Sequence, residues 1–299
     1  MKEQYKQDFI KAGTIAANVR AFGKSLIVPG ASYNAVIQEI YQKIEELGAI
    51  PAFPPQIALN EVAAHFLPQP GTDIIFSNQL IKLDVGICFK GAIGDCACTI
   101  DLSGKYGKII EAAEAALLNA EKIIEVGLPI REIGKIIEST ITSFCLKPVK
   151  NLCGHGLGFY KIHTSPSIPN CDDRSTGVIK PGMTFAIEPF ATNGKGLIFE
   201  AEHPTIFSIV KPRPVKSSYA KALLSKIGSF KGLPFSIHNL ISDDLSLVEV
   251  KLGLTELMGL GIIEGYPPLI DEAYGMVAQA ENSVLVDKNG KVIVTTRVC

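Results

Sequence analysis

The order of the expected helices and strands repeats once along the 299 residues, and this repeat constrains the fold more than any other feature. Apolar positions at helical spacing predict helices at 3–22 and 33–47, and again at 108–126 and 130–145. Each helix pair is followed by a loop that carries a histidine and then by β-rich sequence. Such a duplication predicts two α/β halves that face each other across a cleft.

The β-rich sequence is continuous in the first half and interrupted in the second. Leu80–Phe89 and Ile93–Leu102 are separated by a short turn that contains glycine, which predicts a hairpin. The strand expected at Met183–Ala191 meets no candidate partner before Ser283–Val286. The stretch between these two segments is therefore predicted to be an insertion into the second half.

The insertion is predicted to span residues 196–272, which leaves 1–195 plus 273–299 as the main domain. Helical patterns near 217–228 and 243–259 precede a small β wing at 261–268. Two helices and a wing resemble a winged-helix module, a class that often binds DNA. Because this segment is not notably basic, packing or the docking of a partner is favoured over DNA binding.

Charge and hydropathy argue against several classes of function. The formal net charge of −1 gives no polyanion-binding surface, and no nucleic acid is expected as a partner. The mean hydropathy is +0.25, but no apolar run approaches the roughly 20 residues of a spanning helix, and no membrane partner is expected. The N-terminus lacks the apolar core of a signal peptide, which predicts a cytoplasmic protein. The 7 scattered cysteines predict reduced thiols and no thiolate metal site.

Four carboxylates stand within or beside strongly β-forming sequence. Asp84 and Asp95 each interrupt an apolar strand of the predicted hairpin, where a carboxylate is costly to bury unless it is paired or bound to metal. The two would repel each other across the hairpin, and a shared cation removes that conflict. Glu188 lies inside another apolar run, and Glu281 stands just before the apolar strand 284–286. The alternative for each is a solvated acid on an edge strand or at a strand end.

Three of the 5 histidines occupy related positions in the two halves. His155 is flanked by Gly154 and Gly156, which permit a close approach of the backbone. His163 follows in the same half, and His65 takes the comparable place in the first half. A lone histidine is usually structural, but this set beside four carboxylates favours a site. Oxygen ligands with one imidazole suit divalent ions, and two such ions bridged by carboxylates form a hydrolytic centre that aminopeptidases use.

With these residues in place, the chain resembles the type II methionine aminopeptidases of the pita-bread fold, essentially from end to end. The segments that carry the resemblance are Phe53-Pro54 through Ala63-Ala64-His65, Leu83-Asp84-Val85-Gly86, Cys153-Gly154-His155-Gly156, Ile162-His163, Ile187-Glu188-Pro189-Phe190 and Ala280-Glu281. Eukaryotic members carry a long charged N-terminal extension. The chain shows none, and in this it resembles the shorter archaeal members. The resemblance implies an α+β fold of two pseudo-symmetric α/β halves with an inserted helical, winged-helix-like subdomain.

The resemblance also assigns roles to individual residues. The implied metal ligands are Asp84, Asp95, His155, Glu188 and Glu281, of which Asp95 and Glu281 would bridge two divalent metal ions (Co, Mn, Fe or Zn). The implied catalytic residues are His65, His163 and Glu188, and the implied substrate-binding residues are Phe53, His65, Ile162 and His163. His203 lies near the start of the insertion, and whether it reaches the substrate pocket is left open.

The implied activity is removal of the initiator methionine from nascent proteins with a small second residue, by attack of a hydroxide that bridges the two metal ions. An Xaa-Pro peptidase of the same fold shares all five ligand types, but such enzymes usually carry a separate N-terminal domain and lack this insertion. A non-catalytic binding protein on this scaffold would have lost ligands that the chain retains. No feature predicts a dimer, a monomer is expected, and contact of the insertion with the ribosome is left open.

Overall fold

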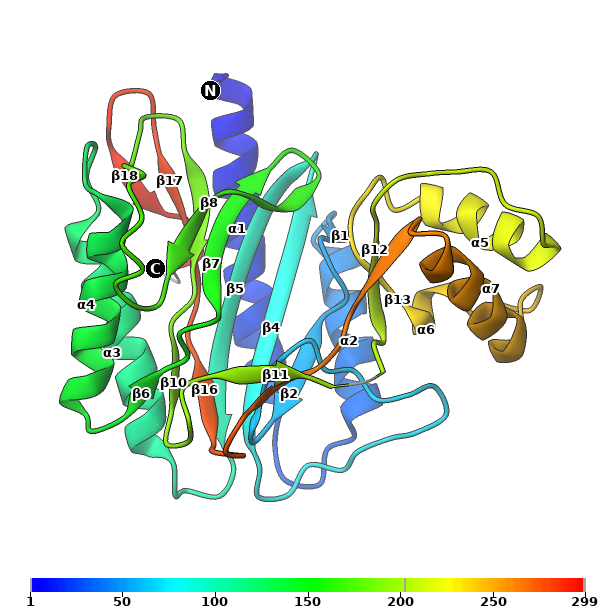
Figure 1. Cartoon of the computed structure of the whole chain (residues 1–299), viewed down its shortest axis with the longest axis horizontal. Coiled ribbons are helices and arrows are strands. Elements are labelled where there is room, and N and C mark those ends of the chain that lie inside the picture. Colours follow the sequence, from blue (N-terminus) through cyan, green and yellow to red (C-terminus); the bar gives the residue numbers. More distant parts are fainter. Residues whose placement is uncertain (1, 202, 298–299) are drawn as a thin grey trace.

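The computed structural model describes residues 2–201 and 203–297, in which helices flank a set of twisted sheets. The helices are α1 (Glu3–Leu26), α2 (Tyr33–Glu46), α3 (Gly107–Ile123), α4 (Ile130–Ser143), α5 (Ser218–Gly228), α6 (Ile237–Leu240) and α7 (Leu247–Gly259). Helices α1 to α4 accompany the long strands, whereas α5 to α7 stand together at the far end of the molecule (Figure 1). Within the described residues, none of these helices combines the length and apolar character needed to cross a membrane.

Each half of the chain builds one main sheet. The first sheet contains β1 (Ile50–Pro51), β2 (Gln56–Leu59), β4 (Leu80–Phe89) and β5 (Ala92–Asp101). Strand β4 pairs antiparallel with the other three, and its hairpin with β5 agrees with the prediction to within one residue. The second sheet has the order β18-β17-β9-β7-β8 and contains β7 (Cys153–Gly158), β8 (Lys161–Pro169), β9 (Thr184–Ile187), β17 (Asn282–Val286) and β18 (Val292–Val294).

Three smaller sheets complete the fold, and one of them joins the first half to the predicted insertion. Their strands are β3 (Val62–Ala64), β6 (Lys147–Pro148), β10 (Phe190–Thr192), β11 (Ile198–Glu200), β12 (Ile206–Ile209), β13 (Phe235–Ser236), β14 (Ile263–Tyr266), β15 (Leu269–Asp271) and β16 (Val277–Gln279). The orders are β16-β10-β6, β11-β15-β3 and β13-β12-β14. Strand β3 of the first half therefore shares a sheet with the two strands, β11 and β15, that lead into and out of the insertion.

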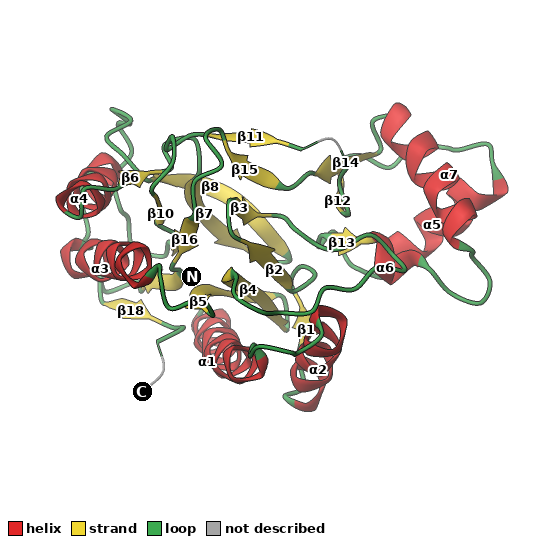
Figure 2. Cartoon of the chain, turned by 90° about the horizontal axis from the view of Figure 1, so that it is seen from below, coloured by secondary structure: helices red, strands yellow, loops and turns green. Residues whose placement is uncertain are grey.

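The two main sheets have separate cores, each covered by a helix pair. In α4, Ile133, Ile137 and Ile141 recur at helical spacing and are fully buried, in a cluster that includes Phe185 of β9 and Val284 of β17. Helices α1 and α2 bury an equivalent stripe against β4. Figure 2 shows α1 with α2 and α3 with α4 as neighbouring pairs around the strands. This arrangement agrees with the predicted duplication.

The strand expected at Met183–Ala191 finds its partner beyond the insertion, as predicted, but it is not continuous. Strand β9 pairs antiparallel with β17, whereas the chain after Glu188 passes into β10 of another sheet. Pro189 explains the break because it has no backbone N–H to donate to a ladder and a restricted φ. Glu188 consequently stands at a corner between two sheets rather than inside a strand.

The segment predicted to be an insertion contains an apolar cluster of its own. Helices α5 and α7 pack on each other and on β12 and β14 through apolar side chains that include Leu223, Leu254 and Leu257. Helix α7 begins at Leu247, four residues later than the expected start at 243. Ser246 caps it, because its side chain accepts from the Glu249 N–H while the Glu249 carboxylate accepts from the Ser246 N–H.

Candidate metal centre

The β4–β5 hairpin presents two aspartates on one face. Asp84 lies opposite Ala97 and Asp95 lies opposite Gly86, and this register places both carboxylates on the same side of the hairpin. Asp95 is only 2% exposed. A Cβ on Gly86 would overlap the ring of Phe53, so glycine allows that ring to pack directly on the hairpin. The first half of the chain thus supplies two carboxylates beside an aromatic ring.

The second half supplies an imidazole and two further carboxylates. His155 projects from β7, Glu188 follows β9, and Glu281 directly precedes β17. The Nε2 atom of His155 lies 3.8 Å from Asp95 Oδ2 and 3.6 Å from Glu188 Oε1. Potential ligand atoms of Asp95, His155 and Glu281 all lie within 4.8 Å of one another. Asp84 lines the same pocket, which places all five predicted ligands together.

So many carboxylates in one buried place are electrostatically costly without a cation. Burial raises the pKa of Asp84 to about 7, and burial followed by the charge of Asp84 holds the pKa of Asp95 well above its ordinary value. Burial first, and then the neighbouring carboxylates, raise the pKa values of Glu188 and Glu281. Within the described residues, Asp84 Oδ1 and Asp95 Oδ1 have no hydrogen-bond partner. This donor set fits divalent cations, which relieve the repulsion and occupy the unpaired oxygens.

His155 is suited to bind a cation because it stays neutral. Burial, and after it the charge of His163, lowers the pKa of His155 to about 3. Its Nε2 atom faces the carboxylates, while Nδ1 lies 3.4 Å from the carbonyl oxygen of Gly156. A neutral imidazole among carboxylate oxygens is a ligand set that Mn, Fe, Co and Zn all accept.

Two buried amides hold Glu188 in place. The Asn170 Nδ2 group donates to the backbone carbonyls of Leu152 and Glu188, at 3.1 and 3.2 Å. The Gln279 Nε2 group lies 3.5 Å from Glu188 Oε2. The side chains of Asn170 and Gln279 are buried. Neither residue was expected from the sequence, because an amide that supports a carboxylate leaves no distinctive local pattern.

The five predicted ligands line one pocket, and its other lining residues come from both halves and from the predicted insertion. The lining residues are Phe53, Gln56, Ala64, His65, Asp84, Asp95, His155, Ile162, His163, Glu188, Ile206, Pro234, Tyr266 and Glu281. Phe53 and Ile162 are each 5% exposed and form an apolar side next to the carboxylates. Every residue predicted to contact metal or substrate therefore lines this pocket.

The two predicted substrate histidines are held differently. His65 has a φ of 62°, and its N–H donates to Gln56 Oε1 at 2.7 Å, which fixes an uncommon backbone conformation. Its ring packs edge-on against Tyr266, and burial lowers the pKa of His65 to about 4. His163 is more exposed, and its ring stands perpendicular to that of His155 with the centroids 4.4 Å apart. Both rings face the pocket as neutral hydrogen-bonding groups.

The insertion contributes to the pocket, but through residues that were not expected. His203 lies in a separate groove and is not among the described residues that line this pocket. Ile206, Pro234 and Tyr266 line it instead. Only the packing of the insertion on the main domain brings Ile206 and Pro234 there, and no local pattern marks them. Tyr266 directly precedes Pro267-Pro268. Because prolines restrict the backbone, this sequence is a signal that could have singled out Tyr266 as an aromatic residue on a rigid segment.

Comparison with known proteins places this geometry in a family. Residues 7–233 match the sequence model of metallopeptidase family M24. The chain belongs to metallopeptidase family M24. It is 37% identical to the methionine aminopeptidase of Methanocaldococcus jannaschii, over 97% of this chain and 98% of that protein.

Solved structures share the fold at lower sequence identity. A methionine aminopeptidase from Thermotoga maritima matches with a TM-score of 0.71 and 20% identity, over 100% of this chain and 98% of that chain. A thermophilic Arx1 matches with a TM-score of 0.86 and 15% identity, over 99% of this chain and 91% of that chain. The predicted α+β pita-bread fold and the predicted class of metal-dependent aminopeptidase are confirmed by the family and its members.

Proposed function

We propose that the chain removes the N-terminal methionine from nascent polypeptides in the cytoplasm and prefers a small second residue. The observation that supports this most is the convergence of four carboxylates, of which Asp95 and Glu281 are buried, and one imidazole in a pocket with an apolar wall. That wall, formed by Phe53 and Ile162, suits an unbranched thioether side chain through dispersion contacts. The archaeal methionine aminopeptidases that the chain resembles support the choice of substrate.

We assign the binding of two divalent cations to the five converging residues. The residues that would hold them are Asp84, Asp95, His155, Glu188 and Glu281. Mn, Fe, Co and Zn suit this set. Such ions, when bound, lower the pKa of water and polarise a carbonyl oxygen.

Glu188, together with two histidines outside the ligand set, carries the proton transfer and the stabilisation of charge. The Glu188 carboxylate, held by Asn170 and Gln279, accepts the proton of the attacking water. His65 and His163 donate hydrogen bonds to the scissile amide and to the oxygen that becomes negative in the tetrahedral intermediate. The fixed backbone of His65 keeps its ring in place for this contact.

We further propose that residues 196–272 form an inserted subdomain in a main domain of 1–195 plus 273–299. Its separate core supports this division. Its role at the site is to contribute to the pocket wall, because Ile206, Pro234 and Tyr266 line the pocket together with residues of the two halves.

Release of the N-terminal residue from Met-Ala-Ser and Ala-Pro-Ala peptides tests the proposal. The protein is stripped of metal with a chelator and resupplied with Mn²⁺ or Co²⁺. The expected result is metal-dependent release of methionine, with Ala-Pro-Ala left intact. Cleavage of Ala-Pro-Ala alone would instead assign an Xaa-Pro peptidase. Cleavage of neither peptide by a metal-loaded protein would favour a binding protein.

A further inference from the structure

Strand β5 and residues 279–283 run side by side and join the two halves beneath the candidate metal centre. The Ser283 hydroxyl accepts from the Asp95 N–H and donates to the Asp95 carbonyl, both at 2.8 Å. Next to this bridge, the Glu281 N–H donates to the Ala97 carbonyl at 3.2 Å. In the described part of the chain, this is the one direct backbone bond between these two segments.

A second hydroxyl repeats the arrangement on the other side of that bond. Thr99 Oγ1 accepts from the Gln279 N–H at 2.8 Å and donates to the Gln279 carbonyl at 2.7 Å. The contacts join residue 95 with 283, 97 with 281 and 99 with 279, which is an antiparallel register. We call residues 95–99 together with 279–283 the seam. In the seam, the hydroxyl groups of Ser283 and Thr99 take the place of direct backbone hydrogen bonds. The two strands are therefore held by fewer backbone hydrogen bonds than two paired strands of a β-sheet.

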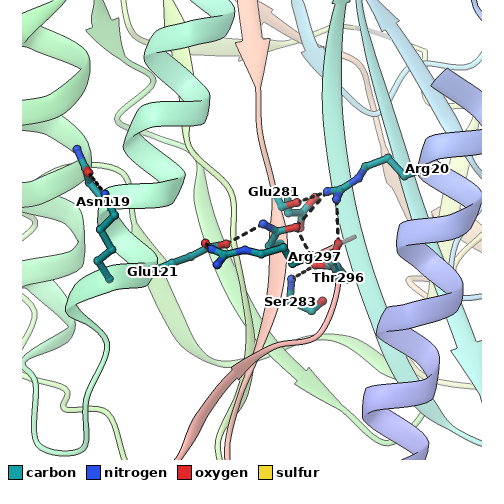
Figure 3. Close-up of polar contacts among 9 residues, drawn as sticks. Arg20, Asn119, Glu121, Glu281, Ser283, Thr296 and Arg297 are labelled. Carbon is teal, nitrogen blue, oxygen red and sulfur yellow. Dashed lines mark hydrogen bonds and ion pairs between the residues drawn. The ribbon is translucent and has the colours of Figure 1, made fainter. Parts of the chain in front are cut away.

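Arg20 adds a restraint from behind the seam. It projects from α1, and its guanidinium donates to the carbonyls of Glu281 at 2.8 Å and Ala97 at 3.3 Å. It also donates to Asn282 Oδ1 at 3.1 Å and to the Thr296 carbonyl at 2.9 Å. Figure 3 shows Arg20 reaching from α1 toward Glu281 and Thr296. One side chain therefore contacts both strands of the seam and the C-terminal segment.

The seam carries one carboxylate of the candidate centre on each strand. Asp95 and Glu281 belong to different halves, and when both are ionised their charges repel each other across the seam. The Ser283 hydroxyl donates a hydrogen bond to the backbone carbonyl of Asp95, and Arg20 donates one to the backbone carbonyl of Glu281. Restraint of these two backbone positions controls the distance between the two side chains.

We propose that Arg20 and Ser283 are positioning residues that set the spacing of the Asp95 and Glu281 carboxylates for two cations. This inference rests on the proposed function, because it assumes that both carboxylates bind metal. Neither residue contacts the substrate in this scheme. Their effect is on the affinity and the geometry of the metal pair.

The first test compares Arg20→Met with Arg297→Met. The Arg297 side chain is 55% exposed and ion-pairs with Glu121 at the edge of the same network, which makes it a matched control. Metal-stripped proteins are titrated with Mn²⁺ by calorimetry. Arg20→Met should bind Mn²⁺ about 10- to 100-fold more weakly, the usual effect of losing a group that orients metal ligands. Arg297→Met should bind it like the unchanged protein.

Kinetics on Met-Ala-Ser separate positioning from general destabilisation. For Arg20→Met, kcat at limiting Mn²⁺ should fall, KM should stay within about threefold, and excess Mn²⁺ should restore kcat. Ser283→Ala, a smaller change, should weaken Mn²⁺ binding in the same way. Unaltered Mn²⁺ affinity in both variants would overturn the inference. So would a loss of kcat that excess Mn²⁺ does not restore and that follows a lower unfolding temperature.

The unchanged protein separates this inference from the proposed function. If it takes up two equivalents of Mn²⁺ and cleaves Met-Ala-Ser while both variants bind Mn²⁺ normally, only the positioning role fails. If the unchanged protein binds no Mn²⁺, the proposed function fails and the inference fails with it.

Discussion

Binding of a divalent cation to the metal-free protein is predicted to release protons, because buried carboxyl groups hold them when no cation is present. Burial raises the pKa of Asp84 to about 7, and this group is about half protonated at pH 7. The pKa values of Asp95, Glu188 and Glu281 are held well above their ordinary values, and each can retain a further proton. His155, with a pKa lowered to about 3, is already neutral and releases none.

The affinity for metal should therefore rise with pH. Each proton displaced by the cation makes the binding constant about tenfold larger per pH unit, which corresponds to about 1.4 kcal/mol. If two protons leave at pH 6, affinity for Mn²⁺ should increase about 100-fold between pH 6 and pH 7. The increase should become less steep above about pH 7, where Asp84 loses its proton without the help of a cation.

Calorimetry in two buffers with different ionisation enthalpies measures the number of protons released at each pH. Asp84→Asn should release about half a proton fewer at pH 7, because it lacks that titrating group. Asp73→Asn is the control, since Asp73 is an exposed acid whose pKa is lowered by hydrogen bonds from Ser32 and Asn34. Release of less than about half a proton at pH 6 would refute the reasoning that burial keeps these groups protonated.

Three further substitutions test separate parts of the structure. Glu188→Gln should lower kcat on Met-Ala-Ser by about 10²- to 10⁴-fold, and a loss smaller than tenfold would exclude Glu188 as the proton acceptor. Phe53→Ala should reduce kcat/KM for Met-Ala-Ser by about 10- to 200-fold, largely through KM; an equal loss for peptides with N-terminal alanine would contradict side-chain recognition. Asp271→Ala removes a fully buried carboxylate that accepts from the N–H groups of Lys195 and Gly196. It should lower the free energy of unfolding in urea by about 3 kcal/mol, and a change below about 1 kcal/mol would mean that other groups satisfy those donors.

Local sequence was sufficient to predict the six longer helices and the first hairpin, but not the short α6. Their signals are periodicity, capping and turn residues, which act between neighbours in the chain. Helix α2, for example, begins after Ser32, whose hydroxyl accepts from the Ala35 N–H, and the chain turns at Gly48 with a φ of 70°. The predicted strand at Met183–Ala191 needed correction because a proline was read as part of an apolar run.

The predicted metal ligands could also be found from local sequence, because some of them contrast with their immediate neighbours. A carboxylate inside an apolar strand is costly to bury, and Asp84 and Asp95 therefore stand out against their neighbours. Glu188 and Glu281 were weaker signals, because each lies at a strand end where a solvated acid is common. Their apolar neighbours still marked both as candidates, and the family resemblance then implied that both bind metal.

The sequence by itself determined the order of the elements and the two helix pairs. It also identified the carboxylates that are too costly to bury without a charged partner or a metal ion. Only the tertiary structure decided which residues of the predicted insertion line the pocket, namely Ile206, Pro234 and Tyr266. It also decided that Arg20 and Ser283 join the two halves beneath the candidate metal centre. The reason is that propensity and periodicity act over a few residues, whereas these contacts join positions more than 100 residues apart, such as Asp95 with Ser283 at a separation of 188. Contacts of that range depend on how the whole chain packs, and they leave no local trace.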